Sequence, residues 1–414
     1  MTAAPAASRR AVAFILATLL VDTIGFGIVI PVLPGLITQL TGEGIADAAV
    51  HGGWLAFAFA VAQFFCAPVL GNLSDRFGRR PVLLLSLLAF GVDYAVMGFA
   101  PTLAWLYAGR IVAGMAGAAF SPAYAYMADV TPPEQRARNF GLLGAAFGAG
   151  FVLGPALGGL LAQLGPRAPF FVASGCALAN FAFGCVALPE TLDPAHRRPF
   201  EWRRANPLGA LAQMRRHPAV LGLLGVMFLW QLGHQVLPAT WSFYSMFKFG
   251  WSPVQVGASL AAVGVLMMIS QGGLTGPLVA RLKERRAAVV GLVCGATMYF
   301  GYAFATQGWM VYAVMLVWLL GGLTYPSVNA LLSRQVPRNA QGELQGAVAS
   351  LYSLSAIAGP PLMAHLFSAF SAPAARVYFP GAALFCAGLL TLGALALLLR
   401  SAPVEPAAAP MEAA

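Results

Sequence analysis

The chain has 414 residues, of which 59% are hydrophobic and only 9% are charged, and its formal net charge is +10. Soluble proteins carry about 25% charged residues, so this composition excludes an ordinary soluble enzyme and predicts a membrane protein. Apolar stretches recur along the whole chain at about the 20-residue length that crosses a bilayer as a helix. Because lipid offers no hydrogen-bond partner to an open backbone, we expect these stretches to be α-helices.

Twelve transmembrane helices are predicted, which makes the chain an all-α integral membrane protein. The predicted spans are 11–40, 52–71, 81–100, 103–128, 139–164, 167–188, 219–247, 253–281, 287–306, 308–333, 342–370 and 374–400. We expect two six-helix bundles, 1–188 and 219–400, joined by a cytoplasmic linker at 189–218 and followed by a disordered tail at 401–414. A short amphipathic helix is expected in the linker near 208–216, lying on anionic headgroups.

The two halves carry related features at a constant offset of 205 residues. GNLSDRFGRRP at 71–81 corresponds to GPLVARLKERR at 276–286, and Gly154 corresponds to Gly359. A tandem repeat of membrane spans is typical of secondary transporters. It also suits alternating access better than a ring-shaped channel.

Basic residues are distributed asymmetrically over the predicted loops. Only Arg167, Lys248 and Arg376 fall on the side opposite the N-terminus. The positive-inside rule therefore predicts that both termini are cytoplasmic, and the net charge reflects this topology rather than binding to nucleic acid. The first apolar run is too long for a cleaved signal peptide. The five cysteines lie in predicted helices without metal-like spacing, so we expect no metal or cofactor.

Four ionisable side chains fall inside the predicted spans: Asp22, Asp93, Arg110 and His234. Such residues are costly in a membrane, so each is a functional hypothesis. A rise of about 1.5 Å per residue places Asp22 about 18 Å from the cytoplasmic end and Asp93 at a similar depth. Arg110 and Asp93 flank the turn at Pro101 by similar numbers of residues, so an ion pair between them is geometrically reasonable.

If that pair forms, Asp22 has no obligatory cation and could gain and lose a proton, as coupling to a proton gradient requires. The alternative is that Asp22 is a structural acid or is itself the partner of Arg110. For Asp93 we favour the structural pair, although all three residues are candidates for proton coupling. Arg110 could instead hold a carboxylate or another acceptor of the substrate through two hydrogen bonds.

The most polar and aromatic patch of the second half is WQLGHQVLPATW, which contains Trp230, Gln231, His234, Gln235 and Trp241. These side chains could line a cavity for a planar, partly polar substrate. The alternative for His234 is a hydrogen bond between two helices.

The charged loop after the second span predicts a latch at the cytoplasmic face. Asp75 is expected to cap or pair at a helix end, and Asp129 is expected to pair with Arg79. The alternative is a topology signal alone, but topology does not require the glycines and the acid. The candidate gating residues are Gly71, Asp75, Arg76, Gly78, Arg79, Arg80 and Asp129.

The fifth span, GLLGAAFGAGFVLGPALGG, presents a smooth surface of small residues and a proline that removes one backbone hydrogen bond. Simple close packing and a gating role are both compatible with this pattern. The candidate residues are Gly150, Gly154, Pro155, Gly158 and Gly159.

These motifs resemble the major facilitator superfamily and, over nearly the full length, its tetracycline-efflux (drug:proton antiporter) branch. DTIGFGIVIPVLP, GNLSDRFGRRPVLLLSL, GRIVAGMAGA and GPALGG carry the resemblance. It implies two six-helix bundles, alternating access and a central cavity. It also implies roles in coupling or substrate handling for Asp22, Asp93 and Arg110, with Gln63 as a further candidate for the cavity.

The second half departs from this pattern. Tetracycline exporters have an acidic residue in the ninth span and a histidine in the eighth, where this chain has Gly295 and Met267. A tetracycline–metal substrate is therefore not implied by the second half, and His234 is a conceivable substitute for the missing groups.

We expect a proton-coupled exporter of small amphipathic compounds in the bacterial inner membrane. Its partners would be a small-molecule substrate, protons and the lipid bilayer, and the chain would act as a monomer. The alternative is an importer or uniporter of a small metabolite, since fold does not fix function. An enzyme is not expected, because the sequence shows no metal cluster, nucleophile–base arrangement or phosphate loop.

Overall fold

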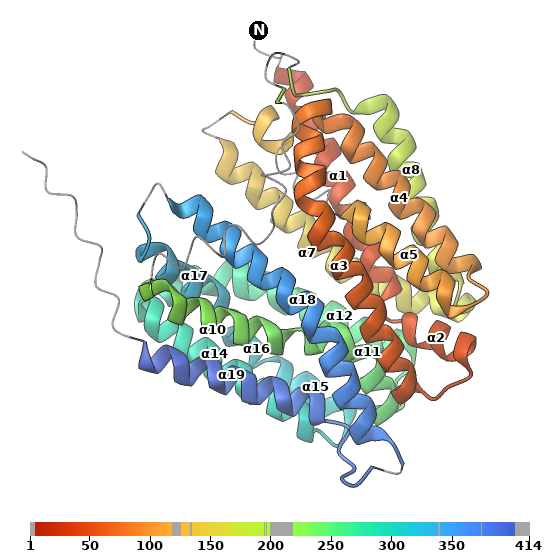
Figure 1. Cartoon of the computed structure of the whole chain (residues 1–414), viewed down its shortest axis with the longest axis vertical. Helices are drawn as coiled ribbons and strands as arrows, with labels where there is room; N and C mark the ends of the chain where they lie inside the picture. The colour runs from red at the N-terminus through yellow and green to blue at the C-terminus, as the bar shows by residue number, and fades with distance from the viewer. Residues whose placement is uncertain are drawn as a thin grey trace, which may run out of the picture. The chain divides into compact units, whose positions relative to one another are not determined.

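The computed structural model describes residues 5–117, 126–132, 135–193, 195, 197–198, 218–337, 340–373 and 375–401 (Figure 1). Within these ranges every regular element is a helix, as the apolar periodicity predicts. The amphipathic linker helix expected near 208–216 and the tail beyond residue 401 lie outside the described residues.

The first half contains seven labelled α-helices. They are α1 (Pro5–Val29), α2 (Leu33–Thr41), α3 (Ile45–Phe77), α4 (Arg79–Phe99), α5 (Leu103–Ala116), α7 (Arg136–Leu161) and α8 (Ala168–Ala187). The expected first span, 11–40, is therefore two helices. Pro34 lies at the start of α2, where the missing N–H of proline costs no helical hydrogen bond.

The second half is more finely divided. Its helices are α10 (Pro218–His234), α11 (Val236–Phe249), α12 (Pro253–Ile269), a π-helix (Ser270–Leu274), α13 (Thr275–Leu282), α14 (Glu284–Phe304), α15 (Gly308–Met315), α16 (Trp318–Gly321), α17 (Thr324–Arg334), α18 (Gln341–Ser371) and α19 (Ala382–Arg400).

Ten helices of the described residues are long and apolar enough to cross a membrane, and a pair bent by 41°, Gly308–Met315 with Trp318–Arg334, would be an eleventh. Helix α5 is shorter, but residues 118–125 of its expected span lie outside the described residues. Each predicted span thus contains at least one apolar helix. The architecture is that of an all-α, multi-pass membrane protein.

Two of the breaks in the second half contact each other. The π-helix Ser270–Leu274 interrupts the eighth span, and Ser270 Oγ donates to the carbonyl of Leu319, 2.7 Å away, at the start of the second bent part of the tenth span. The hydroxyl satisfies a carbonyl that lies in the irregular stretch. Single-turn π-helices often mark functional positions in helices.

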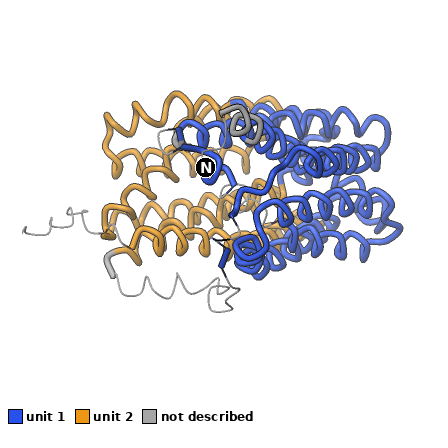
Figure 2. The backbone as a smooth tube through the Cα atoms, turned by 90° about the horizontal axis from the view of Figure 1, so that it is seen from above, with its two compact units in different colours: residues 1–206, 241–265 blue, residues 207–240, 266–414 orange. Residues whose placement is uncertain are grey.

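The chain forms two compact units, which Figure 2 distinguishes by colour. Unit 1 comprises Met1–Asn206 and Trp241–Val265, and unit 2 comprises Pro207–Thr240 and Leu266–Ala414. Most of α11, from Trp241 onward, and most of α12 therefore group with the helices of the first half. The division into bundles at 1–188 and 219–400 follows the sequence repeat and stays a prediction.

Each unit has its own apolar core. In unit 1 a cluster that includes Ile15, Leu83 and Tyr126 joins α1, α4 and the end of the fourth span. In unit 2 a larger cluster joins α10, α14, α17, α18 and α19, with Met227 and Leu344 fully buried. Because lipid is as apolar as these side chains, close packing rather than transfer from water stabilises such helix contacts.

Candidate functional site

An ion pair lies inside unit 1, between α4 and α5. Arg110 donates from Nη2 to Oδ2 of Asp93, and Asp93 is only 1% exposed. The antiparallel arrangement of the two helices brings the residues to the same level, so the predicted pair is confirmed. Whether the pair takes part in proton coupling stays a prediction.

The surroundings of this pair leave it little freedom. Gly109 lies directly beside it, because a Cβ at that position would collide with Oδ1 of Asp93. The guanidinium carbon of Arg110 lies 5.7 Å from the centre of the Phe59 ring, within the range of a cation–π interaction. The arginine charge is thus compensated by a carboxylate and by an aromatic face.

Asp22 on α1 contrasts with this pair. Its Oδ1 is shielded from solvent and has no hydrogen-bond partner among the described residues. Arg110 is engaged with Asp93, so this structure does not support the alternative in which Asp22 is the partner of Arg110. A buried carboxyl oxygen without a cation or donor is costly when ionised, and it can relieve that cost by taking up a proton.

Tyr94 is a site residue that sequence reasoning missed. It is 4% exposed, and its side chain lies near the charges of Asp22, Asp93 and Arg110. The ring also packs against Gly25, one turn along α1 from Asp22, where a Cβ would lie 3.2 Å from the ring. No sequence signal identifies it, because its position depends on the rotation of α4 about its own axis.

Gln63 on α3 has a defined structural contact. Its Nε2 donates to the carbonyl of Gly117 at 3.1 Å, which ties α3 to the end of α5. This bond satisfies one of the carbonyls that a helix end leaves unpaired. A role for Gln63 in a substrate cavity stays a prediction.

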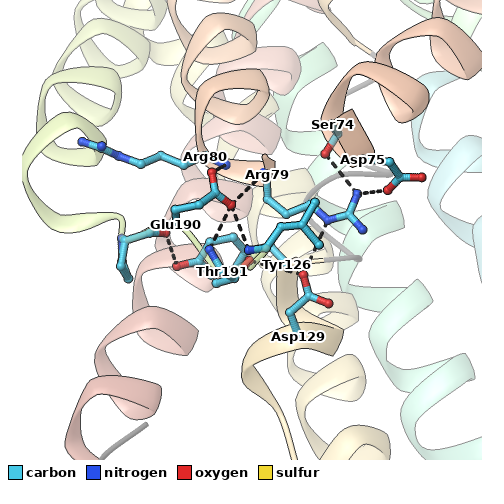
Figure 3. A network of polar contacts seen from close by, with 10 residues as sticks. Ser74, Asp75, Arg79, Arg80, Tyr126, Asp129, Glu190 and Thr191 are labelled. Carbon is cyan, nitrogen blue, oxygen red and sulfur yellow. Dashed lines mark hydrogen bonds and ion pairs between the residues drawn. The ribbon is translucent and has the colours of Figure 1, made fainter. Parts of the chain in front are cut away.

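The cytoplasmic loop between α3 and α4 forms a network of polar contacts (Figure 3). Arg79 Nη1 lies 2.5 Å from Oδ1 of Asp75 and donates to Oγ of Ser74 at 3.2 Å. Arg79 Nε also lies 3.5 Å from Oδ2 of Asp129, which confirms the predicted pair. One guanidinium thus joins the end of α3 to the end of the fourth span.

Glu190, which follows α8, is a second residue that the sequence reasoning missed. Its carboxylate accepts hydrogen bonds from the backbone N–H groups of Arg79 at 2.9 Å and Arg80 at 3.2 Å (Figure 3). These are unpaired donors at the start of α4, where a negative charge is favourable. A capping acid more than a hundred residues away leaves no local signal in the sequence.

Further contacts extend the network, but not all predicted gating residues belong to it. Arg80 Nη2 donates to the carbonyl of Cys185 at 2.6 Å, and Tyr126 donates to the carbonyl of Pro189 at 3.1 Å. Gly78 has a φ of +111°, and a Cβ there would collide with Glu190. The remaining candidates lie apart: Arg76 is exposed over the ring of Phe77, and Gly71 has no neighbour within 4 Å of the place a Cβ would take.

The glycines of α7 allow close contact with α1. A Cβ on Gly150, Gly154 or Gly158 would lie 3.0 Å or less from backbone atoms of α1. Gly159 faces α12 in the same way, with the carbonyl of Pro253 2.6 Å from the place of a Cβ. Pro155 lies at the same level and packs against Gly27. The predicted close packing is confirmed, whereas a gating role stays a prediction.

Unit 2 contains a cavity of about 460 Å³. Four of the five substrate residues predicted in the second half line it: Trp230, Gln231, His234 and Gln235. His234 Nδ1 also shares a hydrogen bond of 2.9 Å with the hydroxyl of Tyr299, so the histidine both lines the cavity and links two helices.

Trp241 is the exception. It does not line this cavity; it belongs to unit 1, where its indole N–H donates to Oγ of Ser259 at 3.0 Å. Its side chain is buried next to Ser259 of α12, which belongs to the same unit.

Sequence reasoning missed further residues of the lining, although a signal for them exists. The cavity is also lined by Gln345, Val348, Ala349, Tyr352 and Ser353 of α18 and by Tyr325 of α17. The spacing of the α18 residues is that of a single helix face. Two polar side chains and a tyrosine on one face of a membrane span could have indicated a cavity.

No group of three or more His, Cys, Asp or Glu side chains that could hold a metal ion occurs in the described part of the chain. The interior of unit 1 is mainly apolar, with Asp93 and Tyr94 among its few buried polar side chains. Aromatic and amide side chains make up most of the cavity lining in unit 2.

Comparison with known proteins agrees with these features. The family model of the Major Facilitator Superfamily matches residues 15–360. The chain is 44% identical over 363 residues to the class C tetracycline resistance protein of Escherichia coli, which covers 87% of this chain and 91% of that protein. It is 43% identical over 351 residues to the class G tetracycline resistance protein of Vibrio anguillarum, which covers 84% of this chain and 88% of that protein.

Among solved structures, a bacterial homologue of the human lysosomal transporter Spinster has the same fold. Its TM-score is 0.78 at 15% sequence identity, and the match covers 96% of this chain and 98% of that one. The sequence motifs, the helical architecture and the family match all agree. The chain therefore belongs to the major facilitator superfamily, whose members are membrane transporters and not enzymes.

Proposed function

We propose that this chain exports small amphipathic compounds, tetracycline-like drugs among them, across the bacterial inner membrane in exchange for protons. The proposal rests on one observation above all: Asp22 has a shielded, unpartnered carboxyl oxygen next to an ion pair that is already compensated. The names of the tetracycline resistance relatives support the same substrate class.

Charge balance explains how the group formed by Asp22, Asp93 and Arg110 in unit 1 could couple the movement of protons to the movement of substrate. The charges of Asp93 and Arg110 cancel each other, so the net charge of the group depends on the state of Asp22. With Asp22 protonated the group is neutral, and with Asp22 ionised it is negative. Because charges interact strongly at low dielectric, the two states favour different conformations or occupants. Tyr94, which lies near all three charges, is placed to stabilise the ionised form.

The cytoplasmic network would hold one conformation of the transporter. Arg79 and Glu190 join the ends of four spans through the contacts in Figure 3. Several of these groups are partly exposed, so each contact is weak and the set can open during turnover. Alternating access between two such conformations is the mechanism by which we expect transport to occur.

The glycine surface of α7 would serve the same cycle from the other side of the membrane. The contacts of Gly154 and Gly158 with α1, and of Gly159 with the start of α12, are tight, and the atoms nearest the place of each Cβ belong to the backbone. Helices with such surfaces can separate and return without repacking. We expect the chain to perform this cycle as a monomer with both termini in the cytoplasm.

Everted membrane vesicles that contain the protein provide the test. With an acidic lumen, uptake of tetracycline should proceed against its concentration gradient and should stop when an ionophore removes the pH difference. Accumulation that ignores the pH difference would remove proton coupling from the proposal. Transport of a sugar or dicarboxylate in the opposite direction would favour the metabolite-importer alternative.

A further inference from the structure

The cavity of unit 2 has flat aromatic walls. The Trp230 and His234 rings are stacked with their centres 5.4 Å apart and their planes within 19°. The ring centre of Tyr325 lies 6.2 Å from that of Trp230, with the two planes tilted by 36°. Tyr352 of α18 also lines the cavity. Planar rings favour stacking with other planar systems, so this shape suits a flat aromatic ligand.

One polar side chain of the lining has unmet hydrogen-bonding capacity. Gln231 is 4% exposed, and neither its amide nitrogen nor its amide oxygen has a partner among the described residues. Buried amides nearly always find partners, and leaving both the donor and the acceptor unpaired is costly. A ligand that offers an acceptor next to a donor would satisfy both atoms after a small rotation of the side chain.

The cavity lining contains no Asp, Glu, Lys or Arg. Apart from tyrosines, its one ionisable residue is His234, and Nδ1 of that ring is already engaged with the hydroxyl of Tyr299. A charged ligand would lose its hydration here without gaining a counter-charge. The lining therefore disfavours metal chelates, organic cations and anions alike.

We propose that this cavity binds an uncharged, planar molecule whose edge carries an adjacent hydrogen-bond donor and acceptor, as in an amide or imide. The edge pairs with the carboxamide of Gln231, and the ring system stacks on Trp230. The inference rests on the proposed function, because it names one class among the amphipathic substrates of the exporter, but its test needs no transport.

The binding test uses the full-length protein in lipid nanodiscs and three fluorescent probes. Lumiflavin is planar and uncharged at neutral pH, and it has an imide edge. 3-Methyllumiflavin is the same molecule with the imide N–H replaced by a methyl group. Ethidium is planar and cationic. Dissociation constants are measured for the protein and for the variants Gln231→Leu and Gln231→Glu. Gln307→Leu, an exposed position outside the cavity, is the control.

We expect lumiflavin to bind about tenfold more tightly than 3-methyllumiflavin, the factor that one well-formed hydrogen bond supplies. Gln231→Leu should remove this preference without weakening 3-methyllumiflavin, and Gln307→Leu should keep it. Gln231→Glu should shift the preference toward ethidium. Equal binding of the two flavins by the unaltered protein would overturn the proposal, as would a preference that survives in Gln231→Leu.

Two features keep the test decisive. If Gln231→Leu does not fold, the comparison of the two flavins on the unaltered protein decides alone. Transport is measured separately in vesicles with and without a pH difference. Flavin discrimination without gradient-driven transport would refute the proposed function and leave this inference standing. Gradient-driven transport without discrimination between the two flavins would support the proposed function and refute this inference.

Discussion

The interiors of the two halves differ in a systematic way. At the repeat offset of 205 residues, Asp22, Asp93 and Arg110 correspond to Met227, Met298 and Met315. All three methionines are buried, at 0% or 1% exposure. Methionine is unbranched, flexible and apolar, so it fills the space of a long polar side chain without its charge. The second half thus keeps the volume of the charged group and loses its chemistry.

A tyrosine next to this charged group is retained in both halves. Tyr94 corresponds to Tyr299, which shares a hydrogen bond with His234 instead of lying near an acid and an arginine. The comparison suggests a division of labour in which unit 1 handles protons and unit 2 provides an uncharged binding surface. The following substitutions test that division.

The largest difference in effect is expected between substitutions of Asp22 in unit 1 and of His234 in unit 2. Asp22→Asn should abolish transport against a gradient, because an amide cannot exchange a proton, while downhill exchange of substrate continues. His234→Gln should keep gradient-driven transport, because the described residues that line the cavity with it include no Asp, Glu, Lys or Arg to couple to. Uptake into proteoliposomes with and without an imposed pH difference measures both. Uphill transport by Asp22→Asn, or its loss in His234→Gln, would break the division.

The ion pair of unit 1 should contribute strongly to stability, unlike the methionines that replace it in unit 2. Removing one partner of a buried pair typically costs about 3–5 kcal/mol, since a charge is left uncompensated. Asp93→Asn and Arg110→Gln should each lower the unfolding free energy on that scale, and the double variant should cost less than their sum. Arg376→Gln, at an exposed loop position, is the control. Additive losses in detergent unfolding experiments would mean that the two side chains are not coupled.

These contrasts also show what a sequence can predict about this molecule. The spans followed from hydropathy, and the Asp93–Arg110 pair followed from similar distances of the two residues to one turn. The breaks at Gln235 and at Ser270–Leu274 did not, because hydropathy is insensitive to the local register of backbone hydrogen bonds. Tyr94 and Glu190 required the rotation of a helix and a contact distant in sequence, and neither is encoded locally.

The Gly-Pro motif of each half offers a third comparison. A Cβ on Gly154 would lie 2.7 Å from the carbonyl oxygen of Ile24, which is backbone and cannot move away. A Cβ on the equivalent Gly359 would lie 2.5 Å from Cβ of Gln235, which moves only together with its backbone. Overpacking costs about 1–3 kcal/mol, so Gly154→Ala and Gly359→Ala should both lie toward the upper end of that range.

Gly144 of α7 is the matched control for this pair, because nothing lies within 4 Å of the place its Cβ would take. Gly144→Ala should be neutral or slightly stabilising, by up to about 1 kcal/mol from helix propensity alone. Thermal unfolding of the three variants gives the order. An equal loss at Gly144 and Gly154 would contradict the packing argument.

The turns after α3 and α13 carry equivalent residues in the left-handed region, Gly78 with φ +111° and Lys283 with φ +64°. Glycine adopts such a conformation without strain, whereas in other residues it raises the conformational free energy by roughly 1 kcal/mol. Lys283→Gly should therefore stabilise the protein by up to about 1 kcal/mol. Gly78→Ala should destabilise it, since its Cβ would also collide with Glu190. Opposite shifts in melting temperature would confirm the comparison, and shifts of the same sign would refute it.

The smallest effect concerns an ion pair that the repeat retains with its charges reversed. Arg79 and Asp129 correspond to Glu284 and Arg334, and both pairs are formed. The position of the link between the helices is therefore common to the halves, while its polarity is not.

The pair of unit 2 is partly exposed, with the Arg334 side chain 59% accessible, so it should contribute only about 0.2–1 kcal/mol. Glu284→Arg should lower stability by that amount or somewhat more, because two like charges then face each other. Adding Arg334→Glu should restore the link with the polarity of the first half. If the double reversal is no more stable than Glu284→Arg alone, the retained link depends on each residue's other surroundings and not on the attraction between the two charges.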